Sequence, residues 1–432
     1  MNGLLSKRED SLVWIFSAFI FLFVLVQVHV VFFNFAVNVN LADFFVMLVM
    51  STLAIEFIYT KKPVFWKVKH FNIYAFLTLA AMICGWLVAF LSDYSITWAG
   101  TKLTGWLIIL GYLYASAMLV NRLGFFTFLR FFNLLLVFFV LVLLLSDIVM
   151  FIEILRGLDG SAVYVSYLTA LSGNRNALAF QILAVLSLAL AFQPLYKKKT
   201  KINQFFLLCC VIVLVASMFF TASRSGIAVM LILYSFALIL KMADWRFLFL
   251  SMTFGLVLSG LVLYTPEIFY FLSNMFSQDV QGEQSARVVM RVSSTESDML
   301  RIQLIKDAFS IWLEHPFFGA GLGAFYTGSA AVYGTAIVQH NSVMWVLSEM
   351  GVFGLLVFAA LFLSLIKFAF FSSRRRGIRQ NAVILLLLAL GAMAMFHEML
   401  YQRIFWLFLG AVIAVGFSDR KSATVLSDEA TA

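Results

Sequence analysis

Several arginines and one histidine are the side chains best suited to bind an anion or transfer a proton in this strongly apolar sequence. Arg175 in Gly-Asn-Arg-Asn, Arg224 in Ser-Arg-Ser-Gly, and Arg301 lie beside or between apolar runs. A guanidinium binds phosphate oxygens through a bidentate fork and keeps its charge at every physiological pH. Several guanidiniums at one membrane face therefore predict a bound anion. A lipid-linked pyrophosphate would fit, because its charge lies where its chain enters the bilayer.

His340 is the best candidate for a general base, since the ordinary pKa of imidazole, about 6.5, lets it accept a proton near neutral pH. A histidine at the start of a helix can equally be a cap or a hydrogen-bonded core residue. Glu349 lies inside an apolar run, where a carboxylate is costly, and it needs a partner. We find no metal-ligand spacing, phosphate-binding loop or nucleophile elbow, so no metal or cofactor is expected.

Each arginine also has a simpler interpretation. Arg403 can pair with Glu398, which is close in sequence, and Arg175 can extend to lipid headgroups. These interpretations are as good as anion binding for Arg403 and Arg175. They are weaker for Arg224, which has no acidic residue nearby.

The composition defines the class of protein that must position these residues. Of the 432 residues, 63% are hydrophobic and 12% are charged, against about 25% charged in soluble domains. This excludes a soluble enzyme, a disordered chain and a disulfide-stabilised secreted scaffold. The net charge of +9 is better explained by basic cytoplasmic loops than by nucleic-acid binding. The prediction is an all-α polytopic membrane protein.

About twelve apolar runs are long enough to span a bilayer. They cover residues 12–34, 37–59, 72–92, 97–120, 127–153, 174–194, 203–220, 225–241, 247–265, 341–370, 381–399 and 404–418. If the N-terminus is cytoplasmic, 21 of the 30 lysines and arginines fall on the cytoplasmic side. Both termini are therefore predicted to be cytoplasmic, with the candidate residues at the opposite face.

A segment of about 75 residues interrupts the short connections. We divide the chain into helices at 1–265, a large external loop at 266–340, helices at 341–418 and a cytoplasmic tail at 419–432, all in one membrane domain. Within the loop, the spacing of apolar residues over 298–314 predicts an amphipathic helix at the membrane interface. His315-Pro316 should end that helix, and Gly319, Gly321 and Gly323 should form a flexible turn.

Motifs in the second half resemble bacterial O-antigen ligases. His340-Asn341 followed by nine residues and Gly351-Val-Phe-Gly is similar to a pattern of that family. The run from Arg301 to Gly319-x-Gly-x-Gly and the Ser-Arg-Ser-Gly turn at Arg224 are similar too. This resemblance covers roughly residues 220–355.

The resemblance implies a metal-independent, inverting glycosyltransferase of the bacterial inner membrane, with its active site facing the periplasm. The donor would be a glycan on undecaprenyl pyrophosphate, and the acceptor a sugar hydroxyl of the lipid A core. Membrane lipids surround the enzyme, and it needs neither nucleic acid nor cofactor. The family's catalytic residues correspond here to His340, Arg301 and Arg224. Substrate-binding positions correspond to Arg175, Asn341, Glu398 and Arg403.

Two other functions remain open. An O-antigen or exopolysaccharide polymerase, or a protein O-oligosaccharyltransferase, would use the same donor with a different acceptor. A transporter or flippase would instead place charged residues near the bilayer midplane, with broken helices or inverted repeats. The one-sided candidate residues and the large external loop favour glycosyl transfer over transport.

Overall fold

The computed structural model describes residues 2–32, 35–60, 69–92, 94, 96–156, 168–263, 295–371 and 377–418. The first part of the predicted loop, with Arg287 and Arg291, lies outside these residues. Residues 61–68 and 372–376, which contain some of the lysines and arginines assigned to the cytoplasmic side, also lie outside them, as does the predicted tail at 419–432. The chain divides into two compact units, Met1–Leu135 with Met299–Ala432, and Leu136–Asp298. Each unit is described by itself.

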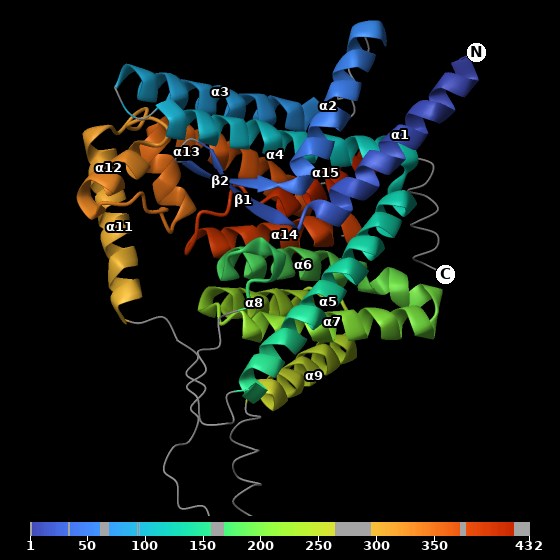
Figure 1. The fold of residues 1–432 in the computed structure, drawn as a ribbon. Helices are drawn as coiled ribbons and strands as arrows, with labels where there is room; N and C mark the ends of the chain where they lie inside the picture. The colour runs from blue at the N-terminus through green and yellow to red at the C-terminus, as the bar shows by residue number, and fades with distance from the viewer. Residues whose placement is uncertain are drawn as a thin grey trace, which may run out of the picture. The chain divides into compact units, whose positions relative to one another are not determined.

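The first unit is a bundle of helices with one small hairpin (Figure 1). Its elements are α1 (Asn2–Phe23), β1 (Gln27–Phe32), β2 (Phe35–Asn40), α2 (Leu41–Thr60), α3 (Lys69–Leu91), α4 (Ile96–Leu123), the beginning of α5 (Phe125–Arg156), α11 (Thr295–Glu314), α12 (Ala324–Tyr333), α13 (Ser342–Phe371), α14 (Ile378–Ala394) and α15 (Arg403–Ser418). Helix α4 packs most extensively against α15, and α13 packs against α3 and α14.

The second unit contains the remainder of α5, the 3-10 turn η3 (Ala170–Ser172), α6 (Arg175–Lys199), α7 (Lys201–Phe220), α8 (Arg224–Ile239) and α9 (Trp245–Leu263). Helix α6 packs against α7 and α8, and α7 packs against α9. The middle of α6, from Leu178 to Ala191, is almost fully buried. Among the long apolar helices of the described part of the chain, α6 is the most deeply buried.

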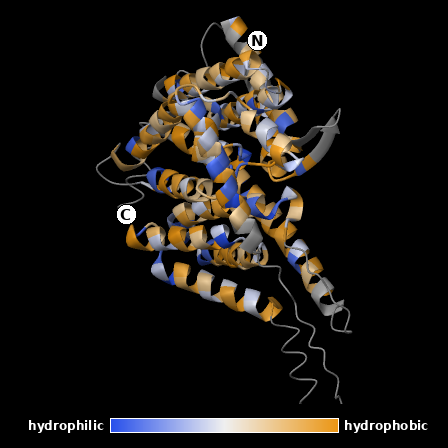
Figure 2. Cartoon of the chain, turned by 90° about the vertical axis from the view of Figure 1, so that its left-hand side faces the viewer, coloured by the Kyte–Doolittle hydropathy of each residue, from blue (hydrophilic) through white to orange (hydrophobic). Residues whose placement is uncertain are grey.

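All twelve predicted runs contain an apolar helix. Seven helices in the described part of the chain are long and apolar enough to cross a membrane, and five shorter apolar helices account for the other runs. Hydrophobic residues, in orange in Figure 2, are spread over the helices of the chain. The prediction of an all-α polytopic membrane protein is therefore confirmed.

The first predicted run, 12–34, is only partly helical. Helix α1 ends at Phe23, and β1 then pairs with β2 in antiparallel register from Gln27↔Asn40 to Phe32↔Phe35. Asn40 stabilises the base of this hairpin, because its Nδ2 donates to the Val24 carbonyl at 2.6 Å. Valine and phenylalanine favour strands, and hydropathy alone does not separate an apolar strand from an apolar helix.

Helix α11 confirms the helix predicted over 298–314, and it ends before His315-Pro316. Its apolar face does not point away from the protein. Leu304 and Ala308 are fully buried and form a cluster with Phe325 of α12. Tyr333 of α12 donates a hydrogen bond to Asp307 at 2.7 Å. The predicted apolar face thus packs on α12.

The predicted run 341–370 is one helix by sequence but is broken in the structure. Gly351 has φ +62° and ψ −163°, so α13 loses its regular hydrogen bonds there. The chain before α12 replaces them. Backbone N–H groups of Ala320 and Gly321 donate to the carbonyls of Ser348 and Glu349 at 2.9 and 3.1 Å. In the other direction, the Val352 N–H donates to the Pro316 carbonyl at 2.9 Å.

The glycines that were expected to form a flexible turn are instead tightly packed. Gly319, Gly321 and Gly323 have φ values of +71°, +99° and +79°. A Cβ on Gly319 would lie 2.3 Å from the Glu349 backbone, and one on Gly321 would lie 2.4 Å from Ala89 of α3. Only glycine allows both this backbone conformation and this approach. The prediction of flexibility was wrong, because spacing does not reveal what surrounds a turn.

The predicted run 381–399 is also longer than the helix that it contains, since α14 ends at Ala394.

We predict that Gly351→Ala lowers the free energy of unfolding by at least about 1–3 kcal/mol, the usual range for a strained backbone. The added Cβ would lie 2.4 Å from the Phe317 carbonyl oxygen. Thermal unfolding of the purified protein in detergent tests this. Gly328→Ala is the matched control, because a Cβ there meets nothing within 4 Å, and it should be neutral or slightly stabilising. Equal melting temperatures for the two variants would contradict the prediction.

Candidate functional site

Arg175 and Arg224 belong to the second unit, and each is the first residue of a helix. Asn174 caps α6, since its side chain accepts from the Asn176 and Ala177 N–H groups at 2.8 and 3.4 Å. Ser223 caps α8 by accepting from the Gly226 N–H at 3.2 Å. A helix N-terminus carries a partial positive charge that favours anions. Both arginines therefore add charge where the backbone is already electropositive.

The two helix starts lie next to each other. The Ser223 hydroxyl donates to the Asn176 side-chain oxygen at 3.0 Å. Gly226 permits this approach, because a Cβ there would lie 2.8 Å from Ala179 and 3.0 Å from the Met218 sulfur. The Ser-Arg-Ser-Gly sequence thus contains a cap, an arginine and the small residue that brings α8 against α6. The structure brings the starts of the two arginine-bearing helices together within this unit.

His340, Asn341 and Arg301 belong to the first unit. Asn341 is the cap of α13, because its Oδ1 accepts from the Val343 and Met344 N–H groups at 2.9 and 3.0 Å. Its Nδ2 donates to the Met395 carbonyl at 2.9 Å. The cap is therefore Asn341, and His340 precedes it. Substrate binding by Asn341 stays a prediction, and the contacts described here are all with backbone groups.

His340 and Arg301 influence each other electrostatically. Burial lowers the pKa of the His340 imidazole below its ordinary value, and the nearby Arg301 charge lowers it further. His340 is consequently neutral at pH 7, the form in which an imidazole accepts a proton. The structure thus brings together two of the three predicted catalytic residues, one from α11 and one from the chain just before α13.

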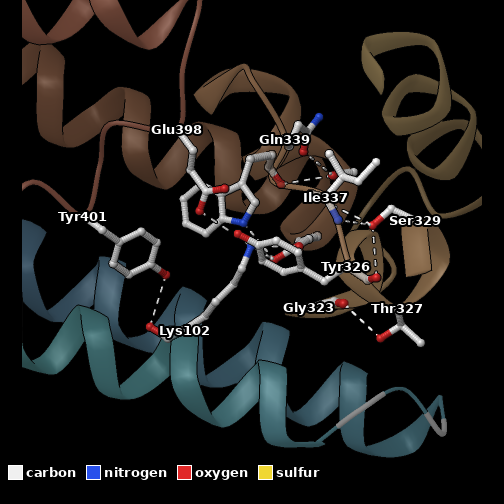
Figure 3. Close-up of polar contacts among 12 residues, drawn as sticks. Lys102, Gly323, Tyr326, Thr327, Ser329, Ile337, Gln339, Glu398 and Tyr401 are labelled. Carbon is white, nitrogen blue, oxygen red and sulfur yellow. Dashed lines mark hydrogen bonds and ion pairs between the residues drawn. The ribbon is translucent and has the colours of Figure 1, made fainter. Parts of the chain in front are cut away.

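A buried charge cluster, consisting of Lys102, Glu349 and Glu398, lies in the same unit. Figure 3 labels Lys102 and Glu398, together with Tyr326 and Tyr401. The Lys102 Nζ donates to both carboxylate oxygens of Glu349, at 2.9 and 3.0 Å. It lies 3.7 Å from Glu398 Oε1. Glu349 is fully buried, and the side chains of Lys102 and Glu398 are each 7% exposed. Lys102 is the partner that the position of Glu349 required.

Aromatic residues enclose this cluster. The Lys102 Nζ lies 4.5 Å from the ring centroid of Tyr326 and 4.8 Å from that of Trp345. The Trp345 indole N–H donates to Glu349 at 2.8 Å, and the Tyr401 hydroxyl donates to the Lys102 carbonyl at 3.1 Å. Aromatic faces attract a cation, most strongly where water is excluded. These contacts stabilise an ammonium that would otherwise be costly to bury.

Glu398 is the less stabilised of the two carboxyl groups. Burial raises its pKa by more than the Lys102 ammonium lowers it, although the Tyr326 hydroxyl also bonds to it. Within the described part of the chain, its Oε2 is buried without a hydrogen-bond partner. One ammonium must serve two buried carboxyl groups, which is why the pKa of Glu398 lies above its ordinary value.

Arg403 pairs with Asp43 of α2 and not with Glu398. Its Nε and Nη2 donate to the two Asp43 oxygens, both at 2.7 Å. Tyr112 donates to the same carboxylate at 2.8 Å. Substrate binding by Arg403 stays a prediction, but two of its donors face a carboxylate within the protein. Among the described residues, no group of three or more His, Cys, Asp or Glu side chains could hold a metal ion.

Sequence reasoning missed the partnership of Lys102 with Glu349 and that of Arg403 with Asp43. Each pair joins residues far apart in the chain, by 247 and 360 positions. A signal was nevertheless present, because Lys102, Glu349 and Asp43 are charged residues inside apolar runs. Such residues need partners, although one sequence does not say which.

We predict that Lys102→Met lowers the free energy of unfolding by about 3–5 kcal/mol, because it leaves two buried carboxylates without their ammonium. The double variant Lys102→Met/Glu349→Gln removes one charge of each sign and should recover most of this loss. Thermal unfolding in detergent measures both. A single variant as stable as the parent chain would show that the pair contributes nothing.

Comparison with known proteins supports the resemblance of the sequence. Residues 208–359 match the family model described as O-antigen ligase. This range contains Arg224, Arg301 and His340, as well as the break in α13. No curated protein and no solved structure matches the chain. The chain therefore carries, at residues 208–359, a domain of the O-antigen ligase family, as its sequence motifs predicted.

Proposed function

We propose that this protein is an O-antigen ligase. It transfers a glycan from undecaprenyl pyrophosphate to a sugar hydroxyl of the lipid A core, with inversion and without a metal. The observation that carries this proposal is the family domain, which contains the neutral His340 beside Arg301. Members of the family are membrane glycosyltransferase-like enzymes with ligase or polymerase activity.

His340 acts as the general base in this proposal. It takes the proton of the acceptor hydroxyl as the hydroxyl oxygen bonds to the anomeric carbon of the donor sugar. The bond from that carbon to the pyrophosphate oxygen breaks, and the electron pair leaves with the pyrophosphate. Attack from the face opposite the leaving group inverts the configuration. Arg301 helps to keep His340 neutral before the reaction, which its effect on the imidazole pKa supports.

Arg224 and Arg175 bind the donor pyrophosphate in this proposal. Their positions at two adjacent helix starts support this role, since backbone N–H groups and guanidiniums both favour phosphate oxygens. Negative charge grows on the pyrophosphate as it leaves, so donors already aimed at it lower the barrier. The leaving group supplies the driving force, and no nucleotide is required.

Lysines and arginines are concentrated in loops on one side of the predicted spans, and such loops are usually cytoplasmic. This distribution supports an orientation with both termini in the cytoplasm. The candidate residues then face the periplasm of a bacterial inner membrane. Helix α13 is broken, which is also a feature of transporters. The backbone groups at the break form hydrogen bonds with the glycine-rich chain before α12, so they are satisfied within the protein. The family match at residues 208–359 favours glycosyl transfer over transport.

A polymerase is the second candidate, because the family match supports a ligase- or polymerase-type function without fixing the donor or the acceptor. In a polymerase, the attacking hydroxyl would belong to a second lipid-linked glycan. The product alone distinguishes the two activities.

We predict that the purified protein, given glycan-loaded undecaprenyl pyrophosphate and lipid A core, forms a glycan ladder on lipid A in a gel assay. His340→Ala should lower the transfer rate at least about 100-fold, the usual contribution of a general base, at unchanged abundance. Arg224→Lys should also be impaired, because a lysine keeps the charge but loses the fork. Longer glycan chains on undecaprenyl, with lipid A unmodified, would identify a polymerase. Full activity of the His340→Ala variant would exclude His340 as the general base.

The pH dependence of transfer gives a separate prediction. The acidic limb of kcat/KM should lie below pH 6.5, because the His340 pKa is lowered and its neutral form is the active one. Arg301→Gln removes a positive charge, so the pKa of His340 should rise and the limb should move to higher pH. Lys306→Gln, an exposed position on the same helix, should leave the limb in place. An unmoved limb in Arg301→Gln would argue that His340 is not the titrating base.

A further inference from the structure

A second histidine faces His340. The ring centroids of His340 and His397 lie 6.0 Å apart with an interplanar angle of 85°. Edge-to-face pairs at this separation are a favoured arrangement of aromatic rings. His397 is 4% exposed, so its ring has little freedom to move. It lies in the turn Met395–Gln402 between α14 and α15, outside the matched range 208–359.

Hydrogen bonds attach this turn to the start of α13. The Ser342 hydroxyl donates to the His397 carbonyl at 2.8 Å and accepts from the Met399 N–H at 3.0 Å. Asn341 adds its bond to the Met395 carbonyl. The two residues directly after His340 therefore hold the backbone on both sides of His397. The imidazoles face each other because their backbones are joined.

The buried charge cluster holds the turn from its other side. Glu398, next to His397, lies against the Lys102 ammonium and the Tyr326 hydroxyl. Tyr401, three residues further on, bonds to the Lys102 carbonyl. The turn is thus held by α13, by α4 and by α12. A segment held by three elements can maintain one ring orientation.

We infer that His397 is a positioning residue for His340: its ring holds the His340 imidazole edge-to-face, in the orientation from which His340 takes the acceptor proton. This inference rests on the proposed function. A base gains efficiency when its orientation is set before the reaction, because a misplaced group loses rate steeply. Buried polar residues around a reactive side chain commonly supply that constraint.

The charges around the two rings fit this role. The charge of Arg301, on α11, lowers the pKa of His340. On the side of His397, the cluster of Lys102, Glu349 and Glu398 has two carboxyl groups for one ammonium, with the Tyr326 and Tyr401 hydroxyls beside it. One positive charge therefore acts on His340, and a cluster with more carboxyl groups than ammonium groups lies beside the turn that carries His397.

The test compares three variants of the full-length protein in the transfer assay. His397→Ala removes the ring and should lower kcat about tenfold or more, with the KM for the lipid-linked donor unchanged. His397→Phe keeps a ring of similar size and should restore most of kcat. His315→Ala is the control, because that histidine is exposed at the end of α11; it should match the parent chain. Each transfer rate is divided by the concentration of monodisperse protein recovered from gel filtration.

A second readout does not depend on activity. Diethyl pyrocarbonate modifies accessible imidazoles, and peptide mass spectrometry gives the rate at which His340 reacts. This rate should rise in His397→Ala and return to the parent value in His397→Phe. The inference is overturned if His397→Ala keeps the parent kcat and the parent modification rate. It is also overturned if His397→Phe is as impaired as His397→Ala, which would assign the effect to a ring nitrogen.

The two proposals fail in different ways. If the parent chain transfers no glycan to either acceptor while the modification rates behave as expected, the proposed function fails and the ring contact stands. If the parent chain is active, His340→Ala is inactive and the His397 variants are normal, only the positioning role is lost. A His397→Ala protein with parent kcat but a lower melting temperature would mean that His397 only stabilises the fold, which also overturns the inference.

Discussion

The first unit depends on one set of backbone hydrogen bonds. They join the glycine-rich chain before α12 to the break in α13. A broken helix at membrane depth leaves N–H and carbonyl groups that lipid cannot satisfy. Here Ala320, Gly321 and Val352 donate the bonds that replace the missing ones. The replacement works only because Gly319 and Gly351 let two backbones approach within a distance that excludes any Cβ.

The break positions the charged residues as well. Glu349 stands two residues before Gly351, and its backbone carbonyl accepts from the Gly321 N–H. Its carboxylate is thereby directed to Lys102 on α4, which in turn lies against Glu398. From Glu398 the contacts continue along the turn to His397 and on to His340. The glycine-rich segment of residues 319–323 thus contributes to the environment of the proposed base.

Buried ion pairs also organise the bundle. The pair of Lys102 with Glu349 joins α4 to α13, and that of Arg403 with Asp43 joins α15 to α2. Such pairs add little net stability compared with well-packed apolar residues, because desolvation offsets most of the attraction. They do make alternative packings costly, since any other arrangement leaves a charge unpaired among apolar side chains. The second unit achieves its close helix contact differently, by a cap and a glycine at the start of α8.

The sequence by itself determined the membrane class, the apolar helices, the helix before His315-Pro316 and the family of the domain at 208–359. These are properties of local composition and periodicity, and one sequence carries them in full. It also indicated that Glu349 needs a partner. Only the tertiary structure decided that the partner is Lys102, that Arg403 pairs with Asp43, and that His397 faces His340. It also decided that the glycine turn is tightly packed and that strands β1 and β2 pair with each other. The physical reason is that pairing and close approach depend on which segments meet in space, and spacing along the chain does not carry that information.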